Sequence, residues 1–194
     1  MTHQVHAFEP PERFVAGTVG PPGERTFFLQ ARGGGRLVSV ALEKVQMSLL
    51  AEKLEELLAE AHRRFGAELP EAPPGLSDNE PLDTPVDEEF RVGTLGLAYD
   101  VDTATVVIEA IAAGESEVEV ELGGAGPELP EDEEDEEPDD DLDRLRVRLT
   151  PAAARAFIDR ARRVLAAGRP PCPLCGQPLD PRGHLCPRHN GYHR

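Results

Sequence analysis

The sequence contains no tryptophan, and aromatic residues make up only 5% of its 194 residues. A core built from it must therefore be mostly aliphatic. No apolar run approaches the ~18 residues that a membrane-spanning helix needs. The first six residues also lack the cationic and apolar regions of a secretory signal peptide. We therefore expect neither a membrane span nor an export signal.

Recognisable catalytic motifs are missing as well. The sequence has no phosphate-binding loop, no nucleophile elbow and no His-Glu-x-x-His, which argues against an enzyme without excluding one. Its three cysteines all fall within residues 172–186, an odd number at a spacing typical of metal ligands. That arrangement favours a metal site in a reducing cytoplasm over a disulfide framework.

The formal net charge of −17 is unevenly distributed along the chain. Residues 1–127 carry 9 basic and 23 acidic side chains, and residues 128–143 carry 12 acidic side chains and no basic one. Residues 144–194 carry 11 Arg against two Asp. A basic C-terminal quarter is thus attached to an acidic body, and the overall charge disfavours non-specific binding to nucleic acid or anionic lipid.

The first half of the chain predicts a run of strands followed by a helix. Strands are expected at 12–19, 25–32 and 36–43, the last two flanking three glycines that favour a hairpin turn. Apolar residues from Leu50 to Phe65 then recur at helical spacing, and Gly66 ends the pattern. His3 and His6 precede these elements, in an N-terminus expected to be mobile, and are assigned no role.

The second half predicts the same order. A proline-rich loop at 67–89 precedes strands at 90–100, 104–112, 117–122 and 144–149, with an acidic disordered insertion at 123–143. The last helix has Thr150 as its cap, Pro151 in its first turn and Gly168 at its end. We expect an α+β domain over residues 1–169, built of two strand-run-plus-helix halves with a mainly antiparallel sheet, and a separate tail at 170–194.

Charge alternation suggests how two of these strands pair. Residues 117–122 place Glu at every second position, and residues 144–149 place Arg at every second position. An antiparallel register that opposes Glu121 and Arg144 would match three Glu–Arg pairs and both apolar faces at once. The sequence therefore predicts that 117–122 pairs with 144–149.

The C-terminal tail carries the most specific motif. Cys172-Pro-Leu-Cys175 is followed, after eight intervening residues, by His184-Leu-Cys186-Pro-Arg-His189. Three thiolates and one imidazole suit a tetrahedral Zn²⁺ ion. The three cysteines are the expected ligands, and either His184 or His189 completes the set. With no vacant ligand position evident, the sequence predicts a zinc knuckle with a structural ion.

A second candidate site lies where a strand becomes the first helix. Glu43, Lys44 and Gln46 are polar side chains at this junction, and Arg25 could join them to hold a phosphorylated ligand against the helix N-terminus. The competing interpretation is that these groups cap the helix, form ion pairs and remain solvated.

Four segments together resemble an uncharacterised actinobacterial family, domain of unknown function 3090. They are residues 24–32, 42–46, 146–151 and 168–192. The similarity spans nearly the whole chain and implies a cytoplasmic setting but no mechanism. The family tail carries Gly-His-x-Cys where this chain has 183–186, and this resemblance favours His184 as the fourth zinc ligand.

The leading functional hypothesis is a cytoplasmic, zinc-containing, non-enzymatic binding or regulatory module, which contacts a protein partner through the basic C-terminal quarter. One alternative is an enzyme, or a companion subunit of one, that acts on a phosphorylated small molecule near Lys44. Another is nucleic-acid binding through the Arg-rich last helix and knuckle, which the acidic body disfavours.

Overall fold

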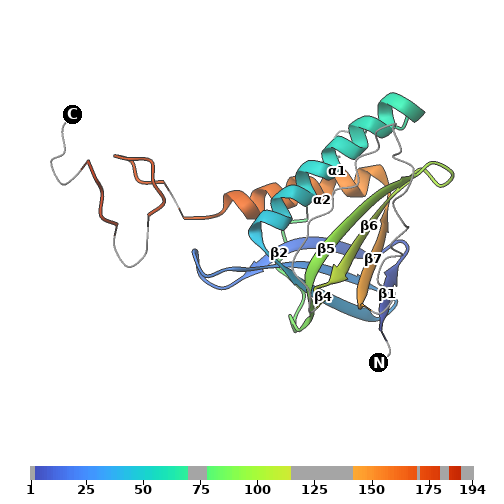
Figure 1. Cartoon of the computed structure of the whole chain (residues 1–194), viewed down its shortest axis with the longest axis horizontal. Coiled ribbons are helices and arrows are strands. Elements are labelled where there is room, and N and C mark those ends of the chain that lie inside the picture. Colours follow the sequence, from blue (N-terminus) through green and yellow to red (C-terminus); the bar gives the residue numbers. More distant parts are fainter. Residues whose placement is uncertain (1–2, 70–77, 115–141, 170, 180–183, 189–194) are drawn as a thin grey trace, which may run out of the picture.

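The computed structural model describes residues 3–69, 78–114, 142–169, 171–179 and 184–188. It is an α+β fold with a mostly antiparallel sheet, as expected (Figure 1). The elements are β1 (Val5–Phe8), β2 (Arg13–Val19), β3 (Thr26–Gly33), β4 (Arg36–Leu42), α1 (Lys44–Phe65), β5 (Glu88–Asp100), β6 (Thr105–Ala112), β7 (Arg144–Leu149) and α2 (Pro151–Ala166). The two halves, β2-β3-β4-α1 and β5-β6-β7-α2, each close a run of strands with a helix.

Local sequence accounts for most element ends. Gly34 and Gly35 take φ values of +56° and +72° in the β3–β4 turn, a conformation that glycine adopts without steric cost. Helix α1 ends at Gly66, which has φ of 65° and donates from its backbone N–H to the carbonyl of His62. Helix α2 begins at Pro151 because the Thr150 hydroxyl accepts from the Ala153 N–H at 3.2 Å.

The seven strands of the described residues form one sheet in the order β1-β7-β6-β5-β4-β3-β2. The two halves meet where β4 pairs with β5 in parallel. The sheet curls so that β1, one edge, approaches the β3–β4 hairpin near the opposite edge. There the Arg36 guanidinium donates to the Ala7 carbonyl at 2.9 Å and lies 4.9 Å from the centroid of the Phe8 ring.

The core fills the inside of this curl. Helices α1 and α2 pack against each other, α2 also against β2 and α1 against β5, so both helices lie across the open side of the sheet (Figure 1). The core is mostly aliphatic, as the composition predicts. Its most buried large side chains include Leu29, Leu42, Met47, Leu50, Leu54, Ile108, Leu145 and Ile158.

The predicted pairing of residues 117–122 with residues 144–149 is wrong. Strand β7 pairs antiparallel with β6 on one side and parallel with β1 on the other, so both of its edges are occupied. Residues 117–122 themselves lie outside the described residues. The β6 register opposes Ile108 to Val147 on the buried face and Glu109 to Arg146 on the other. Strand β6 thus supplies both the apolar match and an acidic partner for Arg146.

The N-terminus also differs from the prediction, because residues 5–8 form β1 and the His6 side chain is only 12% exposed. Within the expected loop at 67–89, residues 78–87 have no regular structure and β5 starts at Glu88. Most of the predicted acidic disordered insertion at 123–143 lies outside the described residues. No helix in the described part of the chain combines the length and apolar character needed to cross a membrane.

Candidate metal centre

The tail beyond α2 folds into a small turn that carries two of the cysteines. Pro171 and Pro178 form an isolated antiparallel bridge, and the Cys172 N–H donates to the Gln177 carbonyl at 2.7 Å. The Gly176 N–H donates back to the Cys172 carbonyl at 2.8 Å, with Gly176 at φ of +74°. This left-handed position favours glycine, so the Cys-x-x-Cys-Gly pattern builds a turn that holds Cys172 and Cys175 on the same side.

Four candidate ligands converge at this turn. The sulfur atoms of Cys172, Cys175 and Cys186 and a ring nitrogen of His184 all lie within 4.8 Å of one another. The Cys172 and Cys186 sulfurs are 3.9 Å apart, and the Cys175 sulfur lies 3.1 Å from Nε2 of His184. Cys172 and Cys186 are 6% and 7% exposed, the lowest values in the described part of the tail. Four side chains that could bind a metal ion are therefore in place.

The spacing of these atoms fits a tetrahedral ion. Sulfur ligands bind Zn²⁺ at about 2.3 Å, which places two of them ~3.8 Å apart. The Cys172–Cys186 separation of 3.9 Å agrees with this value. The same geometry expects a sulfur and a nitrogen ligand ~3.6 Å apart. The Cys175–His184 separation of 3.1 Å is shorter, so the half-buried imidazole would have to move away from this sulfur to bind an ion.

The backbone of the turn favours a thiolate at Cys172. The amide of Cys175, and next that of Leu174, donates to this sulfur and lowers the pKa of Cys172 to about 6. For Cys175, the Gln177 amide acts in the same direction, but desolvation and the nearby Cys172 and Cys186 sulfurs outweigh it and raise the pKa. Crowded thiolates repel one another, and a divalent cation between them relieves that repulsion.

Of the two histidines considered as the fourth ligand, the structure describes His184. His184 lies beside Cys175 and belongs to the cluster. His189 lies outside the described residues, so its alternative role stays a prediction.

A family model described as "Protein of unknown function (DUF3090)" matches residues 6–186. The chain belongs to this family. The match includes all four clustered ligands of the tail and ends at Cys186. No curated protein and no solved structure matches the chain.

In this DUF3090 protein, the strand-to-helix junction has structural contacts. Gln46 accepts from the Glu43 N–H at 2.8 Å, and the two residues form a reciprocal capping box at the start of α1. The Gln46 amide also donates to the carbonyls of Val92 and Gly93 at 3.2 and 3.3 Å, and Arg91 donates to the Glu43 carboxylate at 3.1 Å. Glu43 and Gln46 therefore join α1 to β5.

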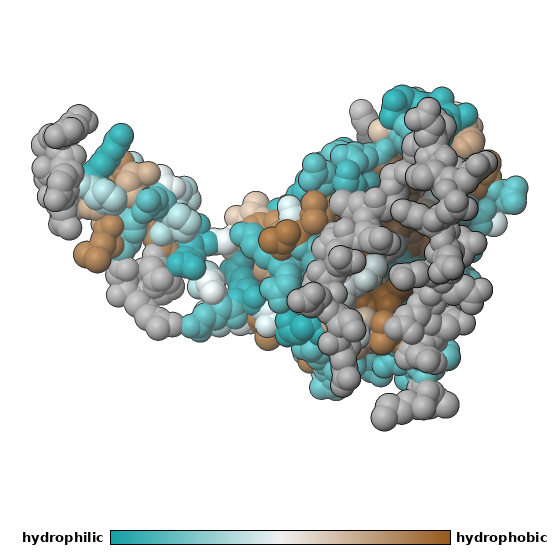
Figure 2. Space-filling view, in the orientation of Figure 1, coloured by the Kyte–Doolittle hydropathy of each residue, from teal (hydrophilic) through white to brown (hydrophobic). Residues whose placement is uncertain are grey.

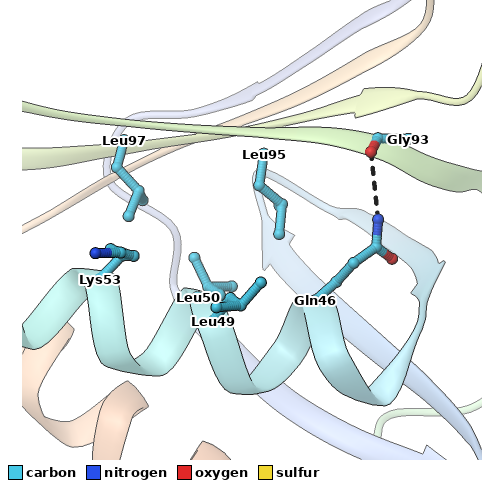
Figure 3. A pocket seen from close by; sticks show the side chains of 7 residues that line it. All are labelled: Gln46, Leu49, Leu50, Lys53, Gly93, Leu95 and Leu97. Carbon is cyan, nitrogen blue, oxygen red and sulfur yellow. Dashed lines mark hydrogen bonds between the residues drawn. The ribbon is translucent and has the colours of Figure 1, made fainter. Parts of the chain in front are cut away.

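The other two candidates for a ligand site do not share a described cavity with them. Arg25 donates to the Ala167 carbonyl at 2.5 Å, at the end of α2, and Lys44 is exposed. A cavity of about 20 Å³ between α1 and β5 is lined by Gln46, Leu49, Leu50, Lys53, Gly93, Leu95 and Leu97 (Figure 3). It has room for about one water molecule, so it is too small for a phosphorylated metabolite.

A buried polar network was not anticipated from the sequence. Asp78 accepts from Arg13 at 2.6 and 2.9 Å and from Arg160 at 2.8 Å, and Arg160 also donates to the carbonyls of Ala16 and Glu80 at 2.7 Å. These contacts hold residues 78–83 against β2 and α2. The partners lie 65 to 144 positions apart in the chain, so no local pattern could identify them.

Proposed function

We propose that this protein is a non-enzymatic, zinc-containing binding or regulatory module, in which a structural Zn²⁺ ion shapes the C-terminal tail for contact with a protein partner. The zinc would be held by Cys172, Cys175, His184 and Cys186. When bound, the ion supplies a rigid cross-link between two short segments that have little core of their own.

The observation that carries this proposal is the closed set of four clustered protein ligands. Catalytic zinc sites typically keep one coordination position open for water or substrate, whereas structural sites use four protein ligands. Here three sulfurs and one imidazole nitrogen lie within 4.8 Å of one another. Such a set leaves no vacant position on a tetrahedral ion, which supports a structural role.

The tail is the part of the basic quarter best placed to reach a partner. The arginines of β7 and α2 bond to groups of the body: Arg146 to Glu109, Arg148 to Asp100, Arg155 and Arg162 to Glu55, Arg160 to Asp78, and Arg163 to Asn79. Arg188 lies in the tail and is exposed. Three metal-binding thiols need reducing conditions, which supports a cytoplasmic setting.

Both alternatives have weaker support. Nucleic-acid binding through the last helix would need its guanidinium groups to face phosphates, and those of Arg160, Arg162 and Arg163 already donate within the chain. The enzyme alternative near Lys44 stays a prediction that no sizeable cavity in the described residues supports.

The test is the metal content of the purified protein. We expect one zinc per chain, and Cys172→Ser should lose it, because three remaining ligands bind zinc far more weakly. Limited proteolysis should then cut the tail of the variant and spare the wild-type tail. His189→Ala is the matched control and should retain the metal, whereas His184→Ala should not. Stoichiometric zinc in the Cys172→Ser protein would contradict the assignment of this zinc site.

A further inference from the structure

Two leucines of the tail face solvent between metal ligands. Leu174 directly precedes Cys175 and is 49% exposed, and Leu185 sits between His184 and Cys186 and is 87% exposed. Cys175 follows Leu174, and His184 and Cys186 flank Leu185, so each leucine lies next to members of the ligand cluster while its own side chain is at the surface. Figure 2 shows hydrophobic residues on the surface of the tail as well as on the body. The tail therefore presents two large apolar side chains on a small scaffold.

The body has apolar side chains of its own where the end of α1 meets the β5–β6 hairpin, a patch made of the exposed Phe65, Leu69 and Val101 and the half-buried Tyr99. Phe65 stacks on Tyr99 with ring centroids 6.0 Å apart, which links the end of α1 to the β5–β6 hairpin. Phe65 and Val101 are each 53% exposed, and Leu69 is 46% exposed. Isolated exposed apolar residues are common on protein surfaces, but a stacked pair with two exposed apolar residues close to it in the chain is typical of an interaction site.

The tail and this patch lie at opposite ends of the molecule. Figure 1 shows the tail beyond the C-terminal end of α2, whereas the end of α1 and the β5–β6 hairpin lie on the far side of the body. Helix α2 alone has 16 residues, a length of about 24 Å. A folded tail attached to the end of α2 is thus directed away from the patch of its own chain.

The charges favour a second copy of this chain as the molecule that binds the patch. Residues 1–143 carry 35 acidic and 9 basic side chains, whereas residues 169–194 carry four Arg and one Asp. Glu68 and Asp102 are exposed beside the patch, and Arg188 is exposed close to Leu185 in the tail. Arg63 and Arg64, also near the patch, both pair with Glu60. The formal charges beside the patch, Glu60, Glu68 and Asp102 against Arg63 and Arg64, sum to −1, so a basic apolar tail meets a weakly acidic surface there.

We propose that the tail of one copy docks its Leu174 and Leu185 on the Phe65–Val101 patch of a second copy. Because tail and patch lie at opposite ends, two antiparallel copies related by a two-fold axis exchange both tails and close the assembly. This inference rests on the proposed function, since it needs the zinc-built tail, and it names the protein partner as the chain itself.

The test measures molar mass and zinc together on the full-length, zinc-loaded protein, by light scattering after size-exclusion chromatography and by elemental analysis. We expect a dimer that dissociates as salt rises. The double variant Leu174→Ser/Leu185→Ser should keep its zinc and dissociate at concentrations at least about tenfold higher than wild type. Val101→Ser should act in the same direction. Val45→Ser is the matched control, because Val45 is 68% exposed outside the patch, and it should remain dimeric.

Mixing the two classes of monomeric variant gives the sharpest result. The tail variant retains an intact patch and Val101→Ser retains an intact tail, so the mixture should form a heterodimer with one working contact. A wild-type protein that carries zinc but stays monomeric over a 100-fold range of protein concentration would overturn the exchange of tails and leave the zinc proposal standing. Dimers unaffected by the leucine substitutions would also overturn it. Absence of zinc would refute the proposed function itself.

Discussion

At the scale of single residues, Asp78 is the acceptor on which two distant arginines converge. Arg13 comes from β2 and Arg160 from α2, and both donate to its carboxylate. The hydrogen bond from Arg13 lowers the pKa of Asp78 in opposition to desolvation, with the charges of Arg13 and Arg160 adding to the effect. One carboxylate thus joins the second strand, the last helix and the segment before β5.

This pairing predicts a pH-dependent contribution to stability. Because the folded-state pKa of Asp78 is depressed, its stabilising effect is complete above the ordinary aspartate pKa of about 4 and is lost as pH falls through the folded-state value. Asp78→Asn should lower the free energy of unfolding by about 2–4 kcal/mol at pH 7. Urea denaturation should show this difference shrinking below pH ~4.

The matched control is Asp87→Asn, at an exposed carboxylate in the same segment. It should change the free energy of unfolding by less than about 0.5 kcal/mol at either pH. An Asp78→Asn protein as stable as wild type at pH 7 would show that the acceptors the two arginines already have, such as the carbonyl of Glu80, are sufficient.

At the scale of elements, short-range patterns predicted what local chemistry determines. The glycine turn between β3 and β4, the Gly66 end of α1 and the Thr150-Pro151 start of α2 are each encoded within a few residues, and each is confirmed. The Cys-x-x-Cys and His-x-Cys spacings likewise predicted the three cysteines that cluster in the tail, and the resemblance to the family favoured His184 over His189 as the fourth side chain. These features need no knowledge of the rest of the chain.

The pairing of strands that lie far apart in the chain was harder to predict from the sequence. The Arg alternation in β7 was assigned to a glutamate-rich segment nearby in sequence, although β6 offers Val106, Ile108 and Ala110 to the buried face of β7. The apolar match decides the pairing, because exposed ion pairs contribute only ~0–1 kcal/mol each. Strand β1 was missed for a related reason. Its four residues pair in parallel with β7, 139 positions further on, and carry no pattern that identifies that partner.

The irregular register of β5 gives an element-scale prediction. The β5–β6 register shifts at Gly93, between Val92 and Thr94, and a Cβ added to Gly93 would lie 2.7 Å from the Cα of Ala113. Backbone atoms cannot move aside as a side chain can, so Gly93→Ala should lower the free energy of unfolding by about 1–3 kcal/mol. Gly96→Ala in the same strand is the control, because the nearest atom to its added Cβ would be the Cβ of Glu109, at an ordinary contact distance of 3.7 Å. Equal thermal stability of the two variants would contradict this account.

At the scale of the whole molecule, the charge asymmetry of the sequence corresponds to contacts inside the fold. The arginines of β7 and α2 come late in the chain, and their acidic partners come before them: Glu109, Asp100, Glu55 and Asp78. The Arg148 hydrogen bond lowers the pKa of Asp100 to about 2, with Thr103 adding to the effect. The basic quarter therefore serves in part to dock the last strand and helix on the acidic body.

The tail does not take part in that core, and this separation yields the last prediction. The buried apolar cluster runs from Phe8 to Ala161 and contains none of the tail residues that the structure describes, of which Cys172 and Cys186 of the metal cluster are the buried ones. Removing zinc with a chelator under reducing conditions should therefore unfold the tail and leave the body intact. The thermal midpoint of the body should shift by less than about 2 °C, while trypsin cuts within residues 170–194 much faster. A fall of the midpoint by 10 °C or more would show that the metal-bound tail stabilises the body, and that the boundary near residue 169 is misplaced.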